Sequence, residues 1–195
     1  MSLKNENYLT GKLLLAMPSI GDPRFDHAVI YICAHDDKGA MGLAINQEAP
    51  GLQFDKVLEQ LGVVSDIELD YKTFPSSVLN GGPVDPGRGF LLHTSEFNQN
   101  ETIRVNDHIG VTGTIEALRD IALGNGPEQF LFILGYAGWS AGQLEDELRQ
   151  NVWLGCEPND EIIFTTDMQE KWKNSISTLG FDPSMLVGNT GSGSA

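Results

Sequence analysis

The spacing of apolar residues along this chain changes repeatedly between the two-residue period of a strand and the longer period of a helix. Leu, Val and Ile dominate residues 9–17 and 26–34, and short apolar runs of this kind predict buried strands. A polar turn at 35–39 separates the second run from residues 41–46, so these segments predict a β-hairpin. Residues 54–61 repeat their apolar positions at helical spacing, which predicts an amphipathic helix.

Strands and helices mix irregularly in the rest of the chain. Further apolar runs predict strands at 77–80, 89–93, 102–105, 109–112, 130–134, 152–155 and 161–165. Helical spacing predicts helices over 114–123, 141–150 and 168–179, the first with Thr114 as its N-cap and Gly124 as its stop. Because strand and helix do not alternate strictly, we expect an α/β fold of the α+β type, with helices packed on a mixed sheet.

The length of the chain indicates one domain. We expect this domain to span residues 1–187, to include a polar connection at 65–76, and to be followed by a flexible polar tail over 188–195.

The chain is strongly acidic. Its 195 residues include 27 Asp and Glu but only 12 Lys and Arg, which gives a formal net charge of −15. The basic residues are dispersed, with Lys171 and Lys173 the closest pair. Duplex DNA binding needs clustered Lys and Arg that displace counterions from phosphates. We therefore expect no direct binding to nucleic acid.

The cysteines and the longest apolar runs indicate a cytoplasmic protein without a membrane segment. Cys33 and Cys156 lie in apolar runs and form no C-x-x-C, which predicts small buried side chains in a reducing compartment. No apolar run approaches the roughly 20 residues needed to cross a bilayer, and the N-terminus lacks the order of a signal peptide. His35, Asp36 and Asp37 have no second His or Cys at ligand spacing, so we assign no metal and no cofactor.

The most informative stretch is 130–147, where an apolar strand leads through a glycine-rich turn into an acidic helix. It contains G-x-S-x-G at 138–142, the string of a hydrolase nucleophile elbow. That elbow requires a His later in the chain, and all four histidines precede Ser140, so we assign no catalytic residue. A hydrolase-like enzyme that uses Ser140 or a polar site centred on His93 stays as the alternative, because other folds place the His first.

Ser140 also begins an S-x-x-Q sequence, which is typical of a capping box. Its side chain would then cap the following helix, and Gln143 would reach back to the Ser140 N–H. Tyr136 and Trp139 flank the apolar strand, so we expect both rings to pack in the core.

Several motifs stand out by their length and their order. They are LTGKLL at 9–14, MPSIGDPRF at 17–25, VIYICAHD at 29–36, GAMGLAIN at 39–46, GGPV at 81–84, RGFLLH at 88–93 and GYAGWSAGQLE at 135–145. Spread over essentially the whole chain, they resemble the AlgH-like (YqgE-type) family of bacterial proteins, whose biochemistry is unassigned. Ala34 departs from the pattern, because many members carry Glu there.

The resemblance implies a single α/β domain whose mixed, bifurcated sheet is folded into a pseudo-barrel with flanking helices. It implies little chemistry: some members are named as transcriptional regulators, but the family has no recognised DNA-binding helix pair. We therefore expect a non-enzymatic module that binds a small ligand or a protein partner, with an indirect regulatory role. The sequence leaves the ligand, the partner and the oligomeric state open.

The candidate ligand-binding residues are polar side chains within otherwise apolar or glycine-rich motifs. A polar group at a strand end or turn is costly unless it is satisfied or used. The candidates are Asp22, Arg24, Asn46, Arg88, His93, Ser140 and Gln143. We expect all but Ser140 to converge in one concavity beside the glycine-rich turn that carries Ser140. For Asp22 and Arg24, a local turn with an ion pair is the simpler explanation.

Overall fold

Continuous apolar runs form the first strands because both faces of the sheet are covered there. In the computed structural model, which describes residues 8–63 and 77–187, β1 (Leu13–Ala16) and β2 (Val29–Asp36) pair antiparallel. Leu13 and Leu15 pack in one apolar cluster, whereas Leu14 and Ala16 pack in another on the opposite face. Since successive side chains of a strand point to opposite faces, every position of such a strand has to be apolar.

The other elements follow in an irregular order. The strands are β3 (Gly39–Ala44), β4 (Glu48–Gln53), β5 (Ser77–Asn80), β6 (Val84–Thr94), β7 (Ile103–Arg104), β8 (Ile109–Thr112), β9 (Phe130–Ser140) and β10 (Trp153–Cys156). The helices are α1 (Phe54–Gln60), α2 (Ile115–Ala122), α3 (Gln143–Arg149), α4 (Lys171–Thr178) and α5 (Pro183–Val187). Two 3-10 turns, η1 (Pro18–Ile20) and η2 (Pro23–Phe25), and a π-helical turn, η3 (Glu161–Thr165), complete the list.

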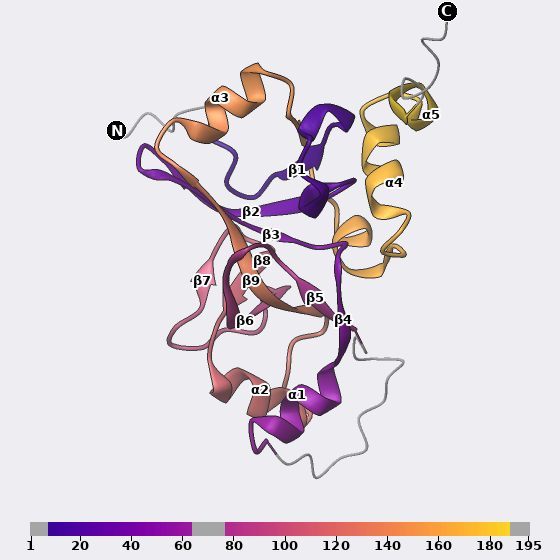
Figure 1. Ribbon diagram of the computed structural model, residues 1–195. Coiled ribbons are helices and arrows are strands. Elements are labelled where there is room, and N and C mark those ends of the chain that lie inside the picture. Colours follow the sequence, from indigo (N-terminus) through magenta and orange to yellow (C-terminus); the bar gives the residue numbers. More distant parts are fainter. Residues whose placement is uncertain (1–7, 64–76, 188–195) are drawn as a thin grey trace, which may run out of the picture.

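Strand β9 joins the two halves of the curled sheet, whose main order is β10-β1-β2-β3-β9-β6-β8-β7. One edge of β9 pairs with β6 along most of its length. Its other edge divides: residues 133–134 pair with β5 in parallel, and residues 137–140 pair with β3 antiparallel. The sheet is therefore mixed and bifurcated, as the resemblance implied, and Figure 1 shows β9 running from one half into the other.

Gly135 lies where β9 bends between these halves. Its φ is 69°, and a Cβ there would lie 2.6 Å from the carbonyl oxygen of Gly82. Opposite it, β6 bulges, since Val84 pairs with Tyr136 but Gly89 pairs with Leu134. A residue with a side chain would be strained at position 135 and would separate the strands.

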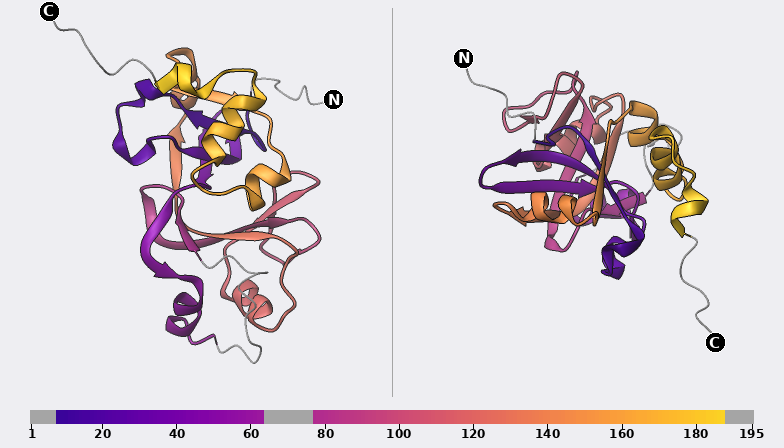
Figure 2. Two further views of the ribbon diagram at one scale, coloured as in Figure 1. Left: turned by 90° about the vertical axis from the view of Figure 1, so that its right-hand side faces the viewer. Right: turned by 90° about the horizontal axis from the view of Figure 1, so that it is seen from above.

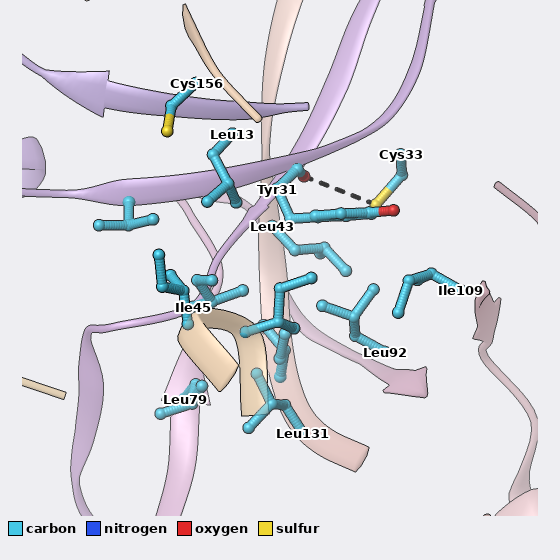
Figure 3. Packing of buried hydrophobic residues seen from close by; sticks show 14 of the residues in the cluster. Leu13, Tyr31, Cys33, Leu43, Ile45, Leu79, Leu92, Ile109, Leu131 and Cys156 are labelled. Atoms are coloured by element: carbon cyan, nitrogen blue, oxygen red, sulfur yellow. Dashed lines mark hydrogen bonds between the residues drawn. The ribbon is translucent and has the colours of Figure 1, made fainter. Parts of the chain in front are cut away.

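The helices cover the sheet in separate places. Figures 1 and 2 show α1 and α2 together at one end, α3 at the other end, and α4 and α5 along one side. Phe54, the first residue of α1, packs its ring against Phe130 and Phe132 of β9. The central cluster, drawn in Figure 3, collects buried side chains from β1, β2, β3, β5, β6, β8 and β9.

Several predicted elements need correction. The strand at 130–134 continues to Ser140, because Gly135, which was expected to lie in a turn, instead allows β6 to approach β9 closely. The strand expected at 161–165 is the π-helical turn η3, whose Ile162 N–H donates to Asn159 Oδ1 at 2.7 Å. Strand β4 and helix α5 were not predicted at all. The connection at 65–76 and the tail at 188–195 lie outside the described residues.

Both cysteines are free and buried, as expected, and Figure 3 shows them on different strands of the central cluster. Tyr136 packs against that cluster and Trp139 is buried in the opposite one, which confirms their predicted packing role. His35 is buried as well, although the sequence suggested a polar hairpin tip: its ring accepts from the Leu9 N–H and contacts Glu145 at 3.1 Å. None of the helices within 8–63 and 77–187 is long and apolar enough to span a membrane.

Candidate functional site

A hollow of about 410 Å³ opens between the η1–η2 segment, the last residues of β9 and helix α3. We call it the Glu147 hollow, after the carboxylate that organises it. Its polar lining residues are Asp22, Arg24, Gln143, Glu147 and Gln150, and its apolar lining includes Ile20, Phe25, Pro83, Trp139, Val152 and Trp153.

The carboxylate of Glu147 holds three elements together. Its Oε2 accepts hydrogen bonds from the indole N–H groups of Trp139 at 2.8 Å and Trp153 at 2.7 Å. Its Oε1 accepts from the side-chain amide of Gln143 at 2.9 Å, one helical turn earlier. Hydrogen bonds to an ionised carboxylate are charge-assisted and strong, so they keep the Glu147 side chain in one position. This side of the hollow is therefore formed before any ligand arrives.

The aromatic side of the hollow is equally ordered. The Trp153 ring packs edge-on against Trp139 at a centroid distance of 5.9 Å and against Phe25 at 5.6 Å. Both indole rings are buried, so they form the floor of the hollow and only a small part of each ring is exposed to solvent. Edge-to-face pairs of this kind favour one relative orientation of the rings.

Asp22 and Arg24 form the opposite side. Asp22 caps the turn η2 by accepting from the Arg24 N–H at 3.0 Å, and its carboxylate also accepts from Arg24 Nε and Nη2, the latter at 2.7 Å. These hydrogen bonds from Arg24 lower the pKa of Asp22. The guanidinium lies over the Phe25 ring, 5.9 Å from its centroid. The local turn with an ion pair is therefore present, and it also fixes a cationic group at the edge of the hollow.

Ser140 lies beside the hollow but does not cap α3. The N-cap of α3 is Gly142, with φ 77°, and Ser140 is the last residue of β9. Half of the predicted capping box is present, because Gln143 Oε1 accepts from the Ser140 N–H at 3.0 Å. The Ser140 hydroxyl donates to the same oxygen at 3.2 Å instead of reaching the helix backbone.

Asn46 has a structural role away from the hollow. Its Oδ1 accepts from the Val29 N–H at 2.8 Å, and its Nδ2 donates to the His27 carbonyl at 2.9 Å. Both hydrogen bonds stabilise the start of β2, which leaves the amide satisfied. Arg88 is also absent from the lining: it lies in the bulge of β6 and its guanidinium covers the Phe90 ring at 5.2 Å.

His93 is buried at the far end of β9, where it pairs with Phe130. Its Nδ1 donates to the Thr94 carbonyl at 2.9 Å, because a carbonyl oxygen can only accept. Burial lowers the pKa of His93, so the ring is neutral near pH 7 and Nε2 accepts from the Thr112 hydroxyl at 2.8 Å. Both ring nitrogens are thus used inside the protein.

The expected convergence of all six side chains is therefore wrong. Asp22, Arg24 and Gln143 come together, whereas Asn46, Arg88 and His93 do not join them. Ser140 and His93 lie at opposite ends of β9, so the arrangement gives Ser140 no histidine base from that residue. Within residues 8–63 and 77–187, no three His, Cys, Asp or Glu side chains group closely enough to hold a metal ion.

Sequence reasoning missed Glu147, Gln150 and Trp153. The sequence pattern placed Glu147 in an acidic helix and indicated no role for its side chain. The signal that identifies it is the spacing of Gln143 and Glu147, four residues apart on one helical face, together with the two tryptophans that flank the helix in sequence.

Comparisons with known proteins match nearly the whole chain. UPF0301 protein blr1492 from Bradyrhizobium diazoefficiens is 46% identical over 188 residues, which cover 94% of this chain and 88% of that protein. UPF0301 protein Rru_A3059 from Rhodospirillum rubrum is 43% identical over 193 residues, 96% of each chain. The crystal structure of protein DIP2367 from Corynebacterium diphtheriae is 18% identical, covers 87% of this chain and 86% of its own, and has a TM-score of 0.68, so it shares the fold.

The solution structure of the AlgH protein from Pseudomonas aeruginosa is similar in both sequence and fold. It is 38% identical, covers 98% of this chain and 100% of its own, and has a TM-score of 0.76. The model of the AlgH-like family matches residues 13–184. This chain therefore belongs to the AlgH-like family.

Proposed function

We propose that this protein is a non-enzymatic binding module and that the Glu147 hollow takes a small ligand with both polar and apolar groups. The observation that supports this is one hollow of about 410 Å³ in which ordered polar side chains face ordered aromatic ones. Ligand sites are typically concave, largely formed in advance, and lined by apolar residues with a few fixed polar groups. The Glu147 carboxylate and the Asp22–Arg24 pair are such groups.

The chemistry of the hollow favours binding over catalysis. The Ser140 hydroxyl donates its hydrogen bond to the amide oxygen of Gln143, which is not a base and cannot activate a nucleophile. Asp22 and Glu147 both accept several hydrogen bonds from fixed donors. Groups held in this way orient a ligand but are poorly placed to move a proton.

Arg24 indicates which ligand groups suit the hollow. Asp22 takes the Nε and Nη2 positions of its guanidinium, and Nη1 has no hydrogen-bond partner among the residues that the structure describes. The side chain is 64% exposed, so this nitrogen is available to a ligand. A carboxylate or carbonyl oxygen pairs well with it, and the apolar part of the same molecule would contact Phe25 and Val152.

The indole N–H signals offer a direct test by NMR. The chain has three tryptophans; Trp139 and Trp153 donate to Glu147, whereas Trp172 donates to the Ala16 carbonyl and does not line the hollow. A library of small carboxylates and amides is added to labelled protein. We expect a binding fragment to shift the first two indole signals and to leave the Trp172 signal in place.

Two matched variants locate the binding site. Arg24→Gln should lower the affinity for the fragment about tenfold or more, because the variant cannot form the charge-assisted hydrogen bond of the guanidinium. Arg104→Gln, at an exposed arginine on β7, should leave affinity unchanged. Equal effects of both variants, or a library without any fragment that moves the Trp139 and Trp153 signals, would contradict the proposed site.

We further propose a cytoplasmic location, supported by two cysteines that are buried and unpaired. With a net charge of −15 opposing contact with duplex DNA, any influence on transcription would pass through the bound ligand or a partner protein.

A further inference from the structure

A second cavity, of about 380 Å³, lies at the other end of the molecule. It lies between helices α1 and α2, the end of β4 and the faces of β6, β8 and β9 that these helices cover, and it is open to solvent on one side. None of its lining residues belongs to the Glu147 hollow. Figure 1 shows α1 and α2 side by side at this end, away from α3.

Two glycines of β6, Gly87 and Gly89, line the cavity. Gly89 and Leu91 of β6 pair with Leu134 and Phe132 of β9, and paired residues of an antiparallel sheet share a face. A Cβ on Gly89 would meet the Phe132 ring at 2.9 Å, so packing explains that glycine. A Cβ on Gly87 would meet nothing within 4 Å, so packing does not explain this one.

Exposed apolar side chains gather at the mouth. The described residues include eight large hydrophobic side chains that are exposed, and three of them, Leu52, Leu61 and Ile115, line this cavity. Single exposed hydrophobic residues are ordinary. Three around one apolar cavity indicate a surface that becomes covered when something binds.

The polar groups of the cavity are mostly used inside the protein. The Thr112 hydroxyl donates to His93, and the Thr114 hydroxyl donates to Gln99 while it accepts from the Ala117 N–H. Gln60, on the last turn of α1, is the lining side chain with an amide. Its amide has no hydrogen-bond partner within the part of the chain that the structure describes.

We propose that this cavity binds a neutral, largely apolar small molecule that directs one polar group to Gln60. With about 30 Å³ for each water-sized group, the volume suits a ligand of about a dozen non-hydrogen atoms. Neutrality follows from the lining, which contains no Lys, Arg, Asp or Glu, and an anion would also oppose the net charge of −15.

The compound 2-naphthol is a suitable probe, because it combines a flat apolar body with one hydroxyl. We expect saturable binding to the full-length protein with a dissociation constant on the order of 1 mM or tighter, followed by the fluorescence of the probe. In NMR spectra, methyl signals of Leu91 and Leu118 should shift. The indole signals of Trp139 and Trp153 should not, which separates this site from the Glu147 hollow.

Two variants should weaken the binding. Gly87→Leu places a side chain in the empty space and should abolish it. Ile115→Glu puts a carboxylate at the mouth and should weaken it about tenfold or more; Glu in the first turn of α2 also suits the helix dipole, so this variant is expected to fold. Ile103→Glu, at an exposed isoleucine outside the cavity, is the matched control and should bind as the wild type does.

A third variant tests the polar contact. Gln60→Ala should lower the affinity for 2-naphthol but leave the affinity for naphthalene unchanged, since naphthalene has no hydroxyl that could bind Gln60. The proposal is overturned if the wild type shows no saturable binding, or if Ile115→Glu binds the probe as tightly as Ile103→Glu. If Gly87→Leu does not fold, Ile115→Glu decides the question alone.

Discussion

The indole N–H of Trp153 donates a 2.7 Å hydrogen bond to the carboxylate of Glu147. Trp153 begins β10 and Glu147 lies on α3, so this hydrogen bond fixes the helix against the edge of the sheet. Trp139 of β9 donates to the same carboxylate oxygen. One acidic side chain therefore joins a helix to two strands that are not neighbours in the sheet.

Glu147→Gln should destabilise the protein by about 1–3 kcal/mol, because an amide nitrogen would replace one accepting oxygen and face a donor. Urea unfolding at pH 7 measures this loss. Asp146→Asn on the same helix is the control: the Asp146 carboxylate pairs with the exposed Arg149 side chain one turn later, and such pairs contribute at most about 1 kcal/mol. Equal losses in both variants would mean that the Trp–Glu contacts do not stabilise the fold.

Ser140→Ala should change the free energy of unfolding by no more than about 0.5 kcal/mol, since Ser140 is exposed and does not cap α3. Thr114→Ala is the comparison. Thr114 is the N-cap of α2 and accepts from the Ala117 N–H, so its loss should cost about 1 kcal/mol.

The Ser140→Ala variant also tests whether Ser140 is a nucleophile. We expect no labelling of wild-type protein by a fluorophosphonate probe, as judged by intact-mass spectrometry. Stoichiometric labelling that disappears in Ser140→Ala would restore the hydrolase alternative.

Lys171 should make stability depend on alkaline pH. It is buried, its Nζ donates to the Ile163 carbonyl, and burial lowers its pKa from 10.5 to about 8. Between those values the unfolded chain binds more protons than the folded one, so the Lys171 contribution to stability rises with pH. The contribution is complete above pH 10.5 and is lost as the pH falls through about 8.

Comparison with Lys171→Met isolates this effect from the other groups that titrate in the same range. The difference in unfolding free energy, wild type minus variant, should increase by up to about 3 kcal/mol between pH 8 and 10.5. Urea unfolding at several pH values in this window measures it. A difference that stays constant with pH would show that Lys171 titrates normally.

Purified protein should not bind duplex DNA at physiological salt, because the net charge is −15 and the basic residues are dispersed. Fluorescence anisotropy of a labelled duplex measures this, with a basic DNA-binding protein titrated alongside. Tight binding that weakens as salt is added would contradict the prediction.

Hydrophobic spacing was enough to predict most strands and helices, because burial on both faces of β1 and β2 leaves a clear apolar run. It failed where tertiary contacts determine the local structure. The segment at 161–165 has strand-like residues, yet Asn159 Oδ1 accepts from the Ile162 N–H and Lys171 donates to the Ile163 carbonyl, and these contacts favour a helical turn. Residues 48–53 contain Pro50 and Gly51, which disfavour a strand, yet this segment pairs with β5 as strand β4.

The candidate site was predicted only in part, because local sequence determines some of its contacts and tertiary packing determines the others. Asp22 and Arg24 are two residues apart, so their contact follows from the local turn. Gln143 joins them through the packing of α3, which the sequence does not encode at short range. His93 and Asn46 are polar residues that satisfy backbone or hydroxyl partners inside the protein, and their sequence context is the same as that of a ligand-binding residue.

The central place of β9 has a consequence for folding during synthesis. Strands β3, β5 and β6 all leave the ribosome before Phe130, yet each has an edge that only β9 covers. Leu13 of β1 waits longer still, for Cys156 of β10. Such long-range pairing slows folding and leaves strand edges exposed in the nascent chain. We therefore expect a truncated chain that ends before residue 130 to aggregate rather than to fold into a stable part of the domain.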